Sequence, residues 1–268
     1  MRDFNFHRPA SVQEAIALLR KHPNGKLLGG GQSLLPVLKL DMADPSDLIS
    51  LSAVPELQGI RRSGSTLTVG AGVRHAEVAA STEVRQAIPG LSGLAEHIGD
   101  AQVRNRGTLG GSLGHADPAA DYPAAILALD AVVETDRRRI AADDYFTGLF
   151  ETALKPDEVI VAVHFPIPQR SAYAKFSSHA SKYALVGVMV AQTAGGVRVA
   201  VTGAGPYAFR VPTLESALAQ DFSASAIAAL GSRIGVRADD LTSSSEASAE
   251  YRAHLISVMA QRAVASAR

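Results

Sequence analysis

The stretch GTLGGSLGHADPAADYPAA, residues 107–125, predicts two different kinds of protein. Read as part of a hydrolase, it contains G-x-S-x-G at Gly110–Gly114, with Ser112 as the nucleophile of a strand-to-helix turn. Read as a phosphate-binding segment, it is a run of glycines and hydroxyl side chains that needs no nucleophile. The residues before the stretch and a second glycine segment upstream bear on the choice.

The hydrolase interpretation lacks its supporting context. A nucleophile elbow follows an apolar central strand, but QVRNRGT precedes the motif and carries Arg104 and Arg106 where a buried strand should run. An acid and a histidine should then follow in chain order, and Asp157 with His164 or His254 are the candidates. Nothing in their sequence setting distinguishes these residues, so the serine hydrolase is kept only as an alternative.

A second glycine segment favours phosphate binding. Gly29–Gly31 follows a short predicted strand at Lys26–Leu28 and precedes a helix-like run. Because glycine has no Cβ atom, backbone N–H groups can approach a diphosphate closely, and a helix start adds a favourable dipole. Ser33, Thr108 and Ser112 add hydroxyl donors. We therefore expect the two segments to hold one diphosphate together.

Weaker motifs are read as structural. The first segment has no G-K-[ST] ending, so no triphosphate loop is predicted. Gly70–His75 reads G-x-G-x-x-H, which matches only part of a dinucleotide fingerprint and is typical of a tight turn. His115 and Asp117 have no third ligand at a sensible spacing, so no metal site is predicted.

Composition excludes several classes of function. The 268 residues are 47% hydrophobic, enough for a large core, and 26 basic residues balance 26 acidic ones, which favours neither nucleic acid nor an anionic membrane. Cysteine is absent, which excludes disulfides, thiolate catalysis and Fe–S clusters on this chain. No apolar run approaches the length of a membrane span, and we expect a cytoplasmic protein.

The hydrophobic periodicity predicts mixed helices and strands. A capping box at Ser11-x-x-Glu14 starts the first helix, and Pro166–Pro168 marks a break after which strands come first and helices follow, as in an α+β domain. Helices are predicted near residues 12–21, 34–40, 75–80, 91–98, 119–129, 213–219, 224–233 and 249–265. Strands are predicted near residues 26–28, 47–51, 57–62, 66–71, 131–135, 158–165, 173–177, 185–193 and 197–203.

Three stretches together resemble the FAD-binding medium subunit of molybdenum hydroxylases, a family that includes flavoprotein subunits of carbon monoxide dehydrogenase and xanthine dehydrogenase. They are KLLGGGQSLLP (residues 26–36), VRNRGTLGGSLGHADPAADYP (103–123) and SAEYRAHL (248–255). The resemblance implies an α+β protein with a two-subdomain FAD-binding fold of the vanillyl-alcohol oxidase (PCMH) type and a C-terminal α+β domain. The implied division is 1–56, 57–168 and 169–268.

The resemblance also implies which residues contact FAD. By position they are Leu28, Gly29, Gly30, Gly31, Gln32, Ser33, Leu34, Thr108, Leu109, Gly110, Gly111, Ser112, Asp121, Ile160 and Lys175. Asp121 could instead cap the following helix, and Lys175 could be a solvated edge residue. Family members usually carry an arginine near His179 and an acid near Lys182, so this chain departs from the family in the segment 177–183 that passes close to the flavin.

The implied function is an FAD-carrying electron-transfer subunit without a catalytic side chain of its own. Its partners would be a large subunit with the molybdenum cofactor and a small subunit with [2Fe–2S] clusters, assembled as a dimer of heterotrimers, with an external electron acceptor. The lack of cysteine agrees with clusters on a partner. A serine hydrolase using Ser112 and a non-catalytic nucleotide-binding or scaffold protein are the alternatives.

Overall fold

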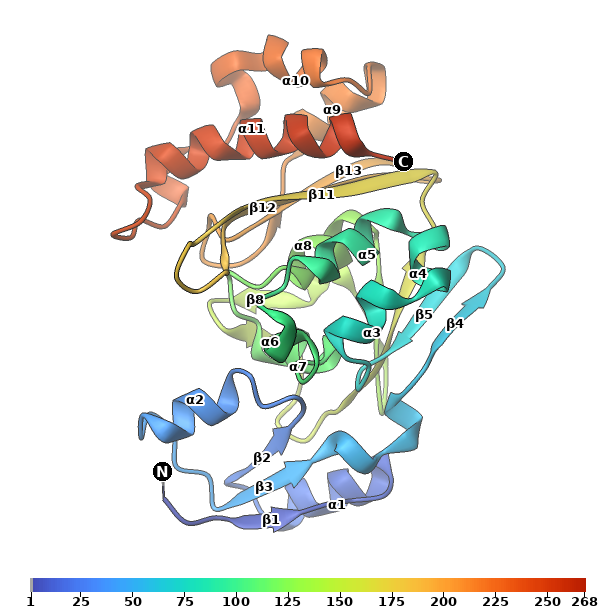
Figure 1. Ribbon diagram of the computed structural model, residues 1–268, viewed down its shortest axis with the longest axis vertical. Coiled ribbons are helices and arrows are strands. Elements are labelled where there is room, and N and C mark those ends of the chain that lie inside the picture. Colours follow the sequence, from blue (N-terminus) through green and yellow to red (C-terminus); the bar gives the residue numbers. More distant parts are fainter. Residues whose placement is uncertain (1) are drawn as a thin grey trace.

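Three main sheets are stacked along the long axis of the molecule in the computed structural model, which describes residues 2–268 (Figure 1). The N-terminal sheet is parallel, with the order β1-β3-β2. This layer comprises β1 (Asn5–His7), α1 (Val12–Lys21), β2 (Gly25–Leu28), α2 (Leu34–Lys39) and β3 (Asp47–Ser50). The Ser11 hydroxyl accepts a hydrogen bond from the Glu14 N–H at 3.1 Å and starts α1, which confirms the predicted cap.

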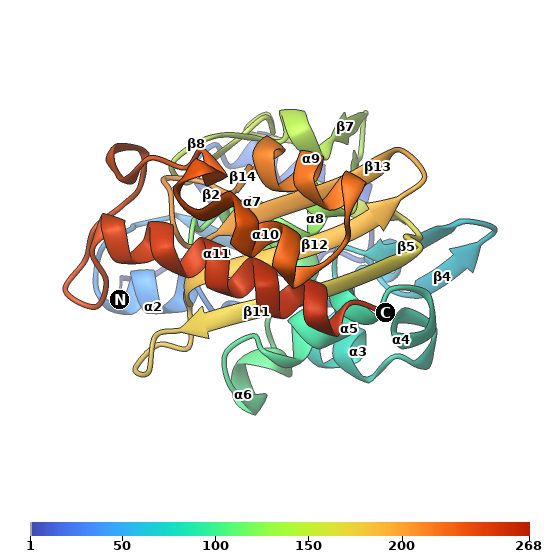
Figure 2. The ribbon, with the colours of Figure 1, turned by 90° about the horizontal axis from the view of Figure 1, so that it is seen from above.

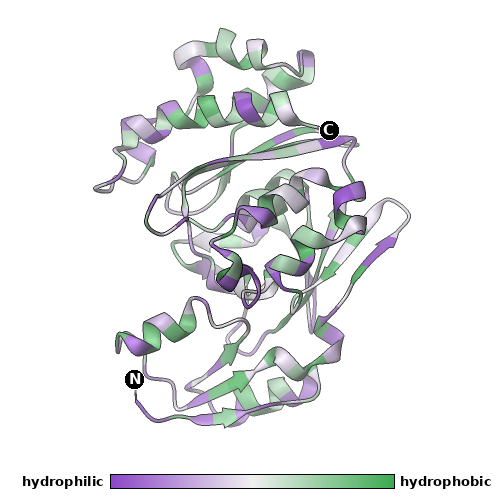
Figure 3. Cartoon of the chain, in the orientation of Figure 1, coloured by the Kyte–Doolittle hydropathy of each residue, from purple (hydrophilic) through white to green (hydrophobic). Residues whose placement is uncertain are grey.

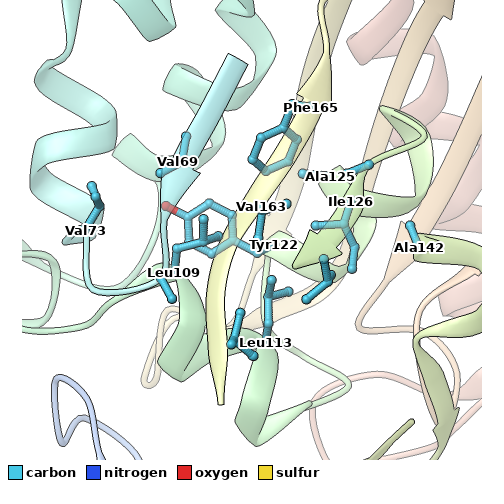
Figure 4. Close-up of a cluster of buried hydrophobic side chains, with 14 of the residues drawn as sticks. Val69, Val73, Leu109, Leu113, Tyr122, Ala125, Ile126, Ala142, Val163 and Phe165 are labelled. Carbon is cyan, nitrogen blue, oxygen red and sulfur yellow. The ribbon is translucent and has the colours of Figure 1, made fainter. Parts of the chain in front are cut away.

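The middle layer is a five-stranded antiparallel sheet, β4-β5-β10-β6-β7. Its elements are β4 (Ile60–Ser63), β5 (Thr66–Gly70), α3 (His75–Ala80), α4 (Thr82–Ala87), α5 (Pro89–Glu96), α6 (Ala101–Arg104), α7 (Leu109–His115), α8 (Tyr122–Ala128), β6 (Val132–Thr135), β7 (Arg139–Ala141), β8 (Phe146–Gly148), β9 (Glu151–Thr152) and β10 (Ile160–Pro166). Tyr122, Leu109, Val163 and Phe165 are fully or almost fully buried between α7, α8 and the sheet (Figure 4). The edge strand β4 is largely hydrophilic (Figure 3), as expected for a strand with one edge in water.

The C-terminal layer is an antiparallel sheet, β11-β12-β13-β14, with helices on both faces. It consists of β11 (Arg170–Ser177), β12 (Ala184–Thr193), β13 (Gly196–Thr202), β14 (Phe209–Arg210), α9 (Pro212–Gln220), α10 (Ala224–Leu230) and α11 (Ala249–Ser266). Helices α9 to α11 cover the outer face, and α5 and α8 lie beneath the sheet (Figures 1 and 2). Val188 and Val190 pack toward α11, whereas Met189 and Ala191 belong to the core of the middle layer. The alternation of side chains along β12 therefore joins the two layers.

All the helices and strands predicted from the sequence are present, but the second glycine segment was predicted wrongly. Residues 108–112 were expected to form the second glycine loop, but helix α7 already begins at Leu109, and its N-cap Thr108 accepts from the Gly111 N–H at 3.1 Å. Leu109 and Leu113 are buried on one face of this helix and stabilise it despite its glycines. The short elements β1, α4, α6, β7, β8, β9 and β14 were not predicted. No helix among residues 2–268 is long and apolar enough to cross a membrane.

Candidate cofactor-binding site

A cavity of about 930 Å³ lies between the N-terminal and middle layers and is lined by residues from many segments of the chain. That volume suits a large organic ligand. Thirteen of the fifteen residues predicted to contact a cofactor line it: Leu28, Gly29, Gly30, Gly31, Gln32, Ser33, Leu34, Thr108, Gly110, Gly111, Ser112, Asp121 and Ile160. The other two do not: Leu109 is buried in the core, and Lys175 lies behind the wall in contact with Asp121.

The two glycine segments touch one another at one end of the cavity. A Cβ atom on Gly30 would lie 2.0 Å from the backbone oxygen of Arg106 and 2.5 Å from the Cα of Gly107. A Cβ atom on Gly29 would lie 2.9 Å from Thr108 Oγ1. Real side chains do not approach backbone this closely. Glycine is therefore required here because the segments pack backbone to backbone.

The second segment is held from behind by the turn that follows β5. Leu109 and Gly110 donate their N–H groups to the carbonyls of Val73 and Ala71, at 3.0 and 2.8 Å. His75 donates its N–H to the Gly107 carbonyl at 3.0 Å. These bonds fix the start of α7 against the end of β5, so its N-terminus lines the cavity.

The hydrogen bonds correct one detail of the predicted site. The N–H of Gly110 is bonded to Ala71, and that of Gly111 to the Thr108 hydroxyl, so neither is free to bind an anion. The free donors lie in the first segment: within residues 2–268, the N–H groups of Gly30, Gly31, Gln32 and Ser33 have no hydrogen-bond acceptor. From the second segment, the hydroxyls of Thr108 and Ser112 are further donors that line the cavity.

Asp121, Tyr173 and Lys175 form a buried polar network behind the cavity wall. The Tyr173 hydroxyl donates to Asp121 Oδ1 at 2.5 Å, and Lys175 Nζ lies 2.9 Å from the same oxygen. The side chains of Lys175 and Asp121 are 1% and 4% exposed. Lys175 also donates to the carbonyls of His97 and Lys182, at 2.7 and 3.0 Å. The lysine therefore ties the end of α5 and the turn before β12 to the cavity wall.

This network excludes the helix-capping interpretation of Asp121 and the solvated-edge interpretation of Lys175. Asp121 precedes α8, but its side chain makes no capping hydrogen bond, and Lys175 is not a solvated edge residue. Burial raises the pKa of Asp121 above its ordinary value, although the Lys175 ammonium and the Tyr173 hydroxyl act in the opposite direction. Burial, followed by the charge of Asp121, raises the pKa of Tyr173.

Sequence reasoning missed part of the lining. Gly72, Arg74 and His75 line the cavity, although their fragment was interpreted only as a tight turn. His75 is 5% exposed, its Nδ1 has no partner within residues 2–268, and burial, followed by Arg104, lowers its pKa to about 4. Tyr183 was not missed: it belongs to the segment 177–183 that the resemblance places close to the flavin, and it lines the cavity with 41% of its surface exposed. The incomplete glycine fingerprint was the available signal for the first group.

The hydrolase constellation is not assembled. Asp157 pairs with Arg20 at 3.0 Å and with Arg137, while His164 pairs with Thr68 and Glu134. His254 lies in α11 on the outer face of the C-terminal sheet. None of these acids or histidines hydrogen-bonds to the serine at position 112 within the described chain. The residues before the motif form α6 rather than an apolar strand.

The chain has an α+β fold, and two glycine segments meet at the wall of a large cavity. These features define the class of proteins that bind a nucleotide cofactor. Residues 2–168 match the family model described as the FAD binding domain in molybdopterin dehydrogenase, and the chain belongs to this family. It therefore has an FAD-binding domain, and its class is that of oxidoreductase subunits.

Known relatives extend the match over the whole chain. The nicotine 6-hydroxylase medium subunit of Paenarthrobacter nicotinovorans is 37% identical over 97% of this chain and 95% of its own. The carbon monoxide dehydrogenase medium chain of Hydrogenophaga pseudoflava is 39% identical over 77% of each chain. Among solved structures, carbon monoxide dehydrogenase from Hydrogenophaga pseudoflava superposes with a TM-score of 0.91, at 34% identity over 99% of this chain and 97% of that chain. The two-subdomain FAD-binding fold with a C-terminal α+β domain is thereby confirmed.

Proposed function

We propose that this chain is the FAD-carrying electron-transfer subunit of a molybdenum hydroxylase, accepting electrons from a [2Fe–2S] subunit and passing them to an external acceptor. The observation that carries the proposal is the contact between the two glycine segments at the cavity of about 930 Å³, next to four N–H groups that have no acceptor among residues 2–268. Family membership supports FAD as the ligand of that cavity.

The residues present fit an FAD diphosphate. A Cβ on Gly29 or Gly30 would collide with the facing segment, and the N–H groups of residues 30–33 are unpaired among residues 2–268. We infer that these N–H groups, with the hydroxyls of Thr108 and Ser112, hold the two phosphates. FAD supplies the exchange of one or two electrons when it is bound. Gly110 packs against Ala71, where a Cβ would lie 2.6 Å from that residue's Cβ, and it positions the helix start.

The other named residues would orient the cofactor rather than react. Ile160 is 7% exposed and lines the cavity, with its Cδ1 3.7 Å from where a Cβ on Gly114 would lie. Asp121 lines the cavity and is held by Lys175, so we infer contact of Asp121 with FAD and an indirect role for Lys175. The Asp121 carboxylate and the Lys175 ammonium form an ion pair with each other. This pairing supports a subunit that has no general acid or base of its own.

We extend the proposal to domains and partners. The strands change sheets between Ser50 and Ile60 and again between Pro166 and Arg170, which supports a division into 1–56, 57–168 and 169–268. The relatives are named as medium subunits or chains. That naming, with the lack of cysteine here, supports a large subunit with the molybdenum cofactor and a small [2Fe–2S] subunit as partners, in a dimer of heterotrimers.

The deciding experiment is purification of the chain both alone and co-expressed with the two subunits of its complex. We expect a yellow complex that releases one FAD per copy of this chain on denaturation, and whose flavin is reduced when substrate is supplied to the large subunit. A colourless complex would favour the scaffold alternative. Labelling of Ser112 by a fluorophosphonate would favour the hydrolase. Bound FAD that substrate cannot reduce would refute the electron-transfer role and leave the FAD site in place.

Replacing Ser112 by alanine is expected to weaken FAD binding only modestly. The change removes one neutral hydroxyl donor, which contributes about 0.5–1.5 kcal/mol, and leaves the backbone of α7 in place. Titration of flavin-free protein with FAD, followed by fluorescence quenching, measures the change. Thr193→Ala, at the end of β12 and outside the cavity lining, is the control. Complete loss of flavin in the serine variant would show that Ser112 does more than donate one hydrogen bond.

A further inference from the structure

Two histidines and an aspartate converge in the N-terminal layer, outside the lining of the FAD cavity. His7 is the last residue of β1, His22 follows α1, and Asp47 is the first residue of β3. None of the three lines the cavity. His7 Nε2 lies 2.8 Å from Asp47 Oδ1, and His22 Nδ1 lies 3.2 Å from Asp47 Oδ2. Their ligand atoms all lie within 4.8 Å of one another.

The surroundings of the aspartate resemble the support that metal ligands receive. The Ser46 hydroxyl donates to Asp47 Oδ2 at 2.6 Å, and Asn5 Nδ2 donates to Oδ1 at 3.1 Å. The Asp47 side chain is 3% exposed, so its orientation is fixed by these neighbours and by the sheet. Hydrogen bonds of this kind orient a metal-binding carboxylate and raise metal affinity.

We propose that His7, His22 and Asp47 bind one divalent transition metal ion of the Zn²⁺ class. Two imidazole nitrogens and a carboxylate oxygen are ligands that Zn²⁺ and its neighbours prefer, whereas Mg²⁺ and Ca²⁺ take oxygen ligands. Metal–ligand distances of about 2.0–2.2 Å in a tetrahedral site place ligand atoms about 3.4 Å apart. Small side-chain rotations would bring the present nitrogen–oxygen distances of 2.8 and 3.2 Å to that value.

The exposure of the two histidines and the position of the proton on each neutral ring permit this site. Their side chains are 25% and 24% exposed, so an ion can enter from solvent and keep water as a further ligand. A neutral imidazole carries one N–H and one bare nitrogen, and moving the proton to the outer nitrogen presents the bare one to the ion. The three ligands come from β1, the end of α1 and β3, so a bound ion would join three segments of this layer.

The competing interpretation is a hydrogen-bonded anchor for the strand ends that binds no metal. Removing a histidine distinguishes the two, because glutamine can still donate a hydrogen bond to Asp47 but is a poor ligand for Zn²⁺. His22→Gln is the main variant and His7→Gln the second. His254→Gln is the matched control, since His254 is exposed, lies in α11, and belongs neither to the cluster nor to the cavity lining.

The experiment uses the full chain in its complex, stripped of metal by a chelator and then titrated with Zn²⁺ by calorimetry. We expect one tight Zn²⁺ per chain, a rise in melting temperature on binding, and an affinity at least about 100-fold weaker in His22→Gln and His7→Gln but unchanged in His254→Gln. Tetrahedral Co²⁺ absorption bands, lost in the same variants, would identify the site. Absence of stoichiometric Zn²⁺ binding, or binding unaffected by either cluster variant, overturns the proposal. FAD content is measured in parallel and is expected to stay constant.

Discussion

Gly30→Ala is expected to abolish FAD binding although it adds a single methyl group. The new Cβ would lie 2.0 Å from the Arg106 carbonyl oxygen and 2.5 Å from the Gly107 Cα, and both are backbone atoms that cannot rotate away. The two segments would have to separate, which would move the N–H groups of residues 30–33 away from the hydroxyls opposite them. Flavin content of the purified protein, with its melting temperature, measures the effect.

Gly93→Ala is the matched control for this prediction. Gly93 lies in α5, and a Cβ there would meet nothing within 4 Å beyond its chain neighbours and the backbone of its own helix. Alanine in the interior of a helix should stabilise it slightly, by up to about 1 kcal/mol. Full flavin content in Gly30→Ala would contradict the packing of the two segments described here. Loss of flavin in both variants would mean that the chain tolerates no added methyl group, irrespective of site.

The glycine segments show which part of the site was predictable. The run of glycines at positions 29–31 and 110–111 predicted a cofactor contact, because glycine serves wherever backbone must come close to a partner. The partner that the structure provides for Gly30 and Gly110 is other backbone, from Arg106 and Ala71. Sequence alone does not separate close approach to a ligand from close approach to the same chain.

Helix α7 was missed because local propensity argued against it. Its sequence, LGGSLGH, contains three glycines, and each costs a helix about 1 kcal/mol relative to alanine. Tertiary contacts outweigh that cost, since Leu109 and Leu113 are buried and Thr108 caps the first turn. The periodic segments, by contrast, were predicted close to their observed bounds: Val12–Lys21, Ala184–Thr193 and Ala249–Ser266 carry strong caps or long apolar runs.

The setting of Lys175 depends on contacts distant in sequence. Lys175 lies in a strand, where side chains point alternately to the two faces of the sheet. The sequence pattern therefore predicts which face Lys175 is on, but not which residues cover that face. The covering group is Asp121, which is 54 residues away in the chain. The same holds for His7, His22 and Asp47, whose proximity results from the β1-β3-β2 strand order rather than from any ligand spacing in the sequence.

Asp121→Asn is expected to destabilise the folded chain by about 3–5 kcal/mol. The substitution removes the carboxylate from a lysine whose side chain is 1% exposed, and an uncompensated buried charge has a cost of this order. An amide also offers the Tyr173 hydroxyl a weaker acceptor than a carboxylate. Denaturant unfolding of the flavin-free protein gives the free energy directly. The control is Asp239→Asn, which breaks an ion pair between the exposed side chains of Arg237 (73%) and Asp239 (80%). This change should cost less than about 1 kcal/mol.

The double variant Asp121→Asn/Lys175→Met separates the charge from the rest of the network. Methionine fills most of the space of lysine without a charge, so removing both ions should recover much of the stability that the single variant loses. If the double variant is as unstable as Asp121→Asn, the cost comes from packing or from Tyr173, and the charge argument is wrong. Flavin binding then tells the two roles of Asp121 apart. A double variant that folds normally but no longer retains FAD would show that the Asp121–Lys175 pair contributes to cofactor binding beyond its contribution to folding.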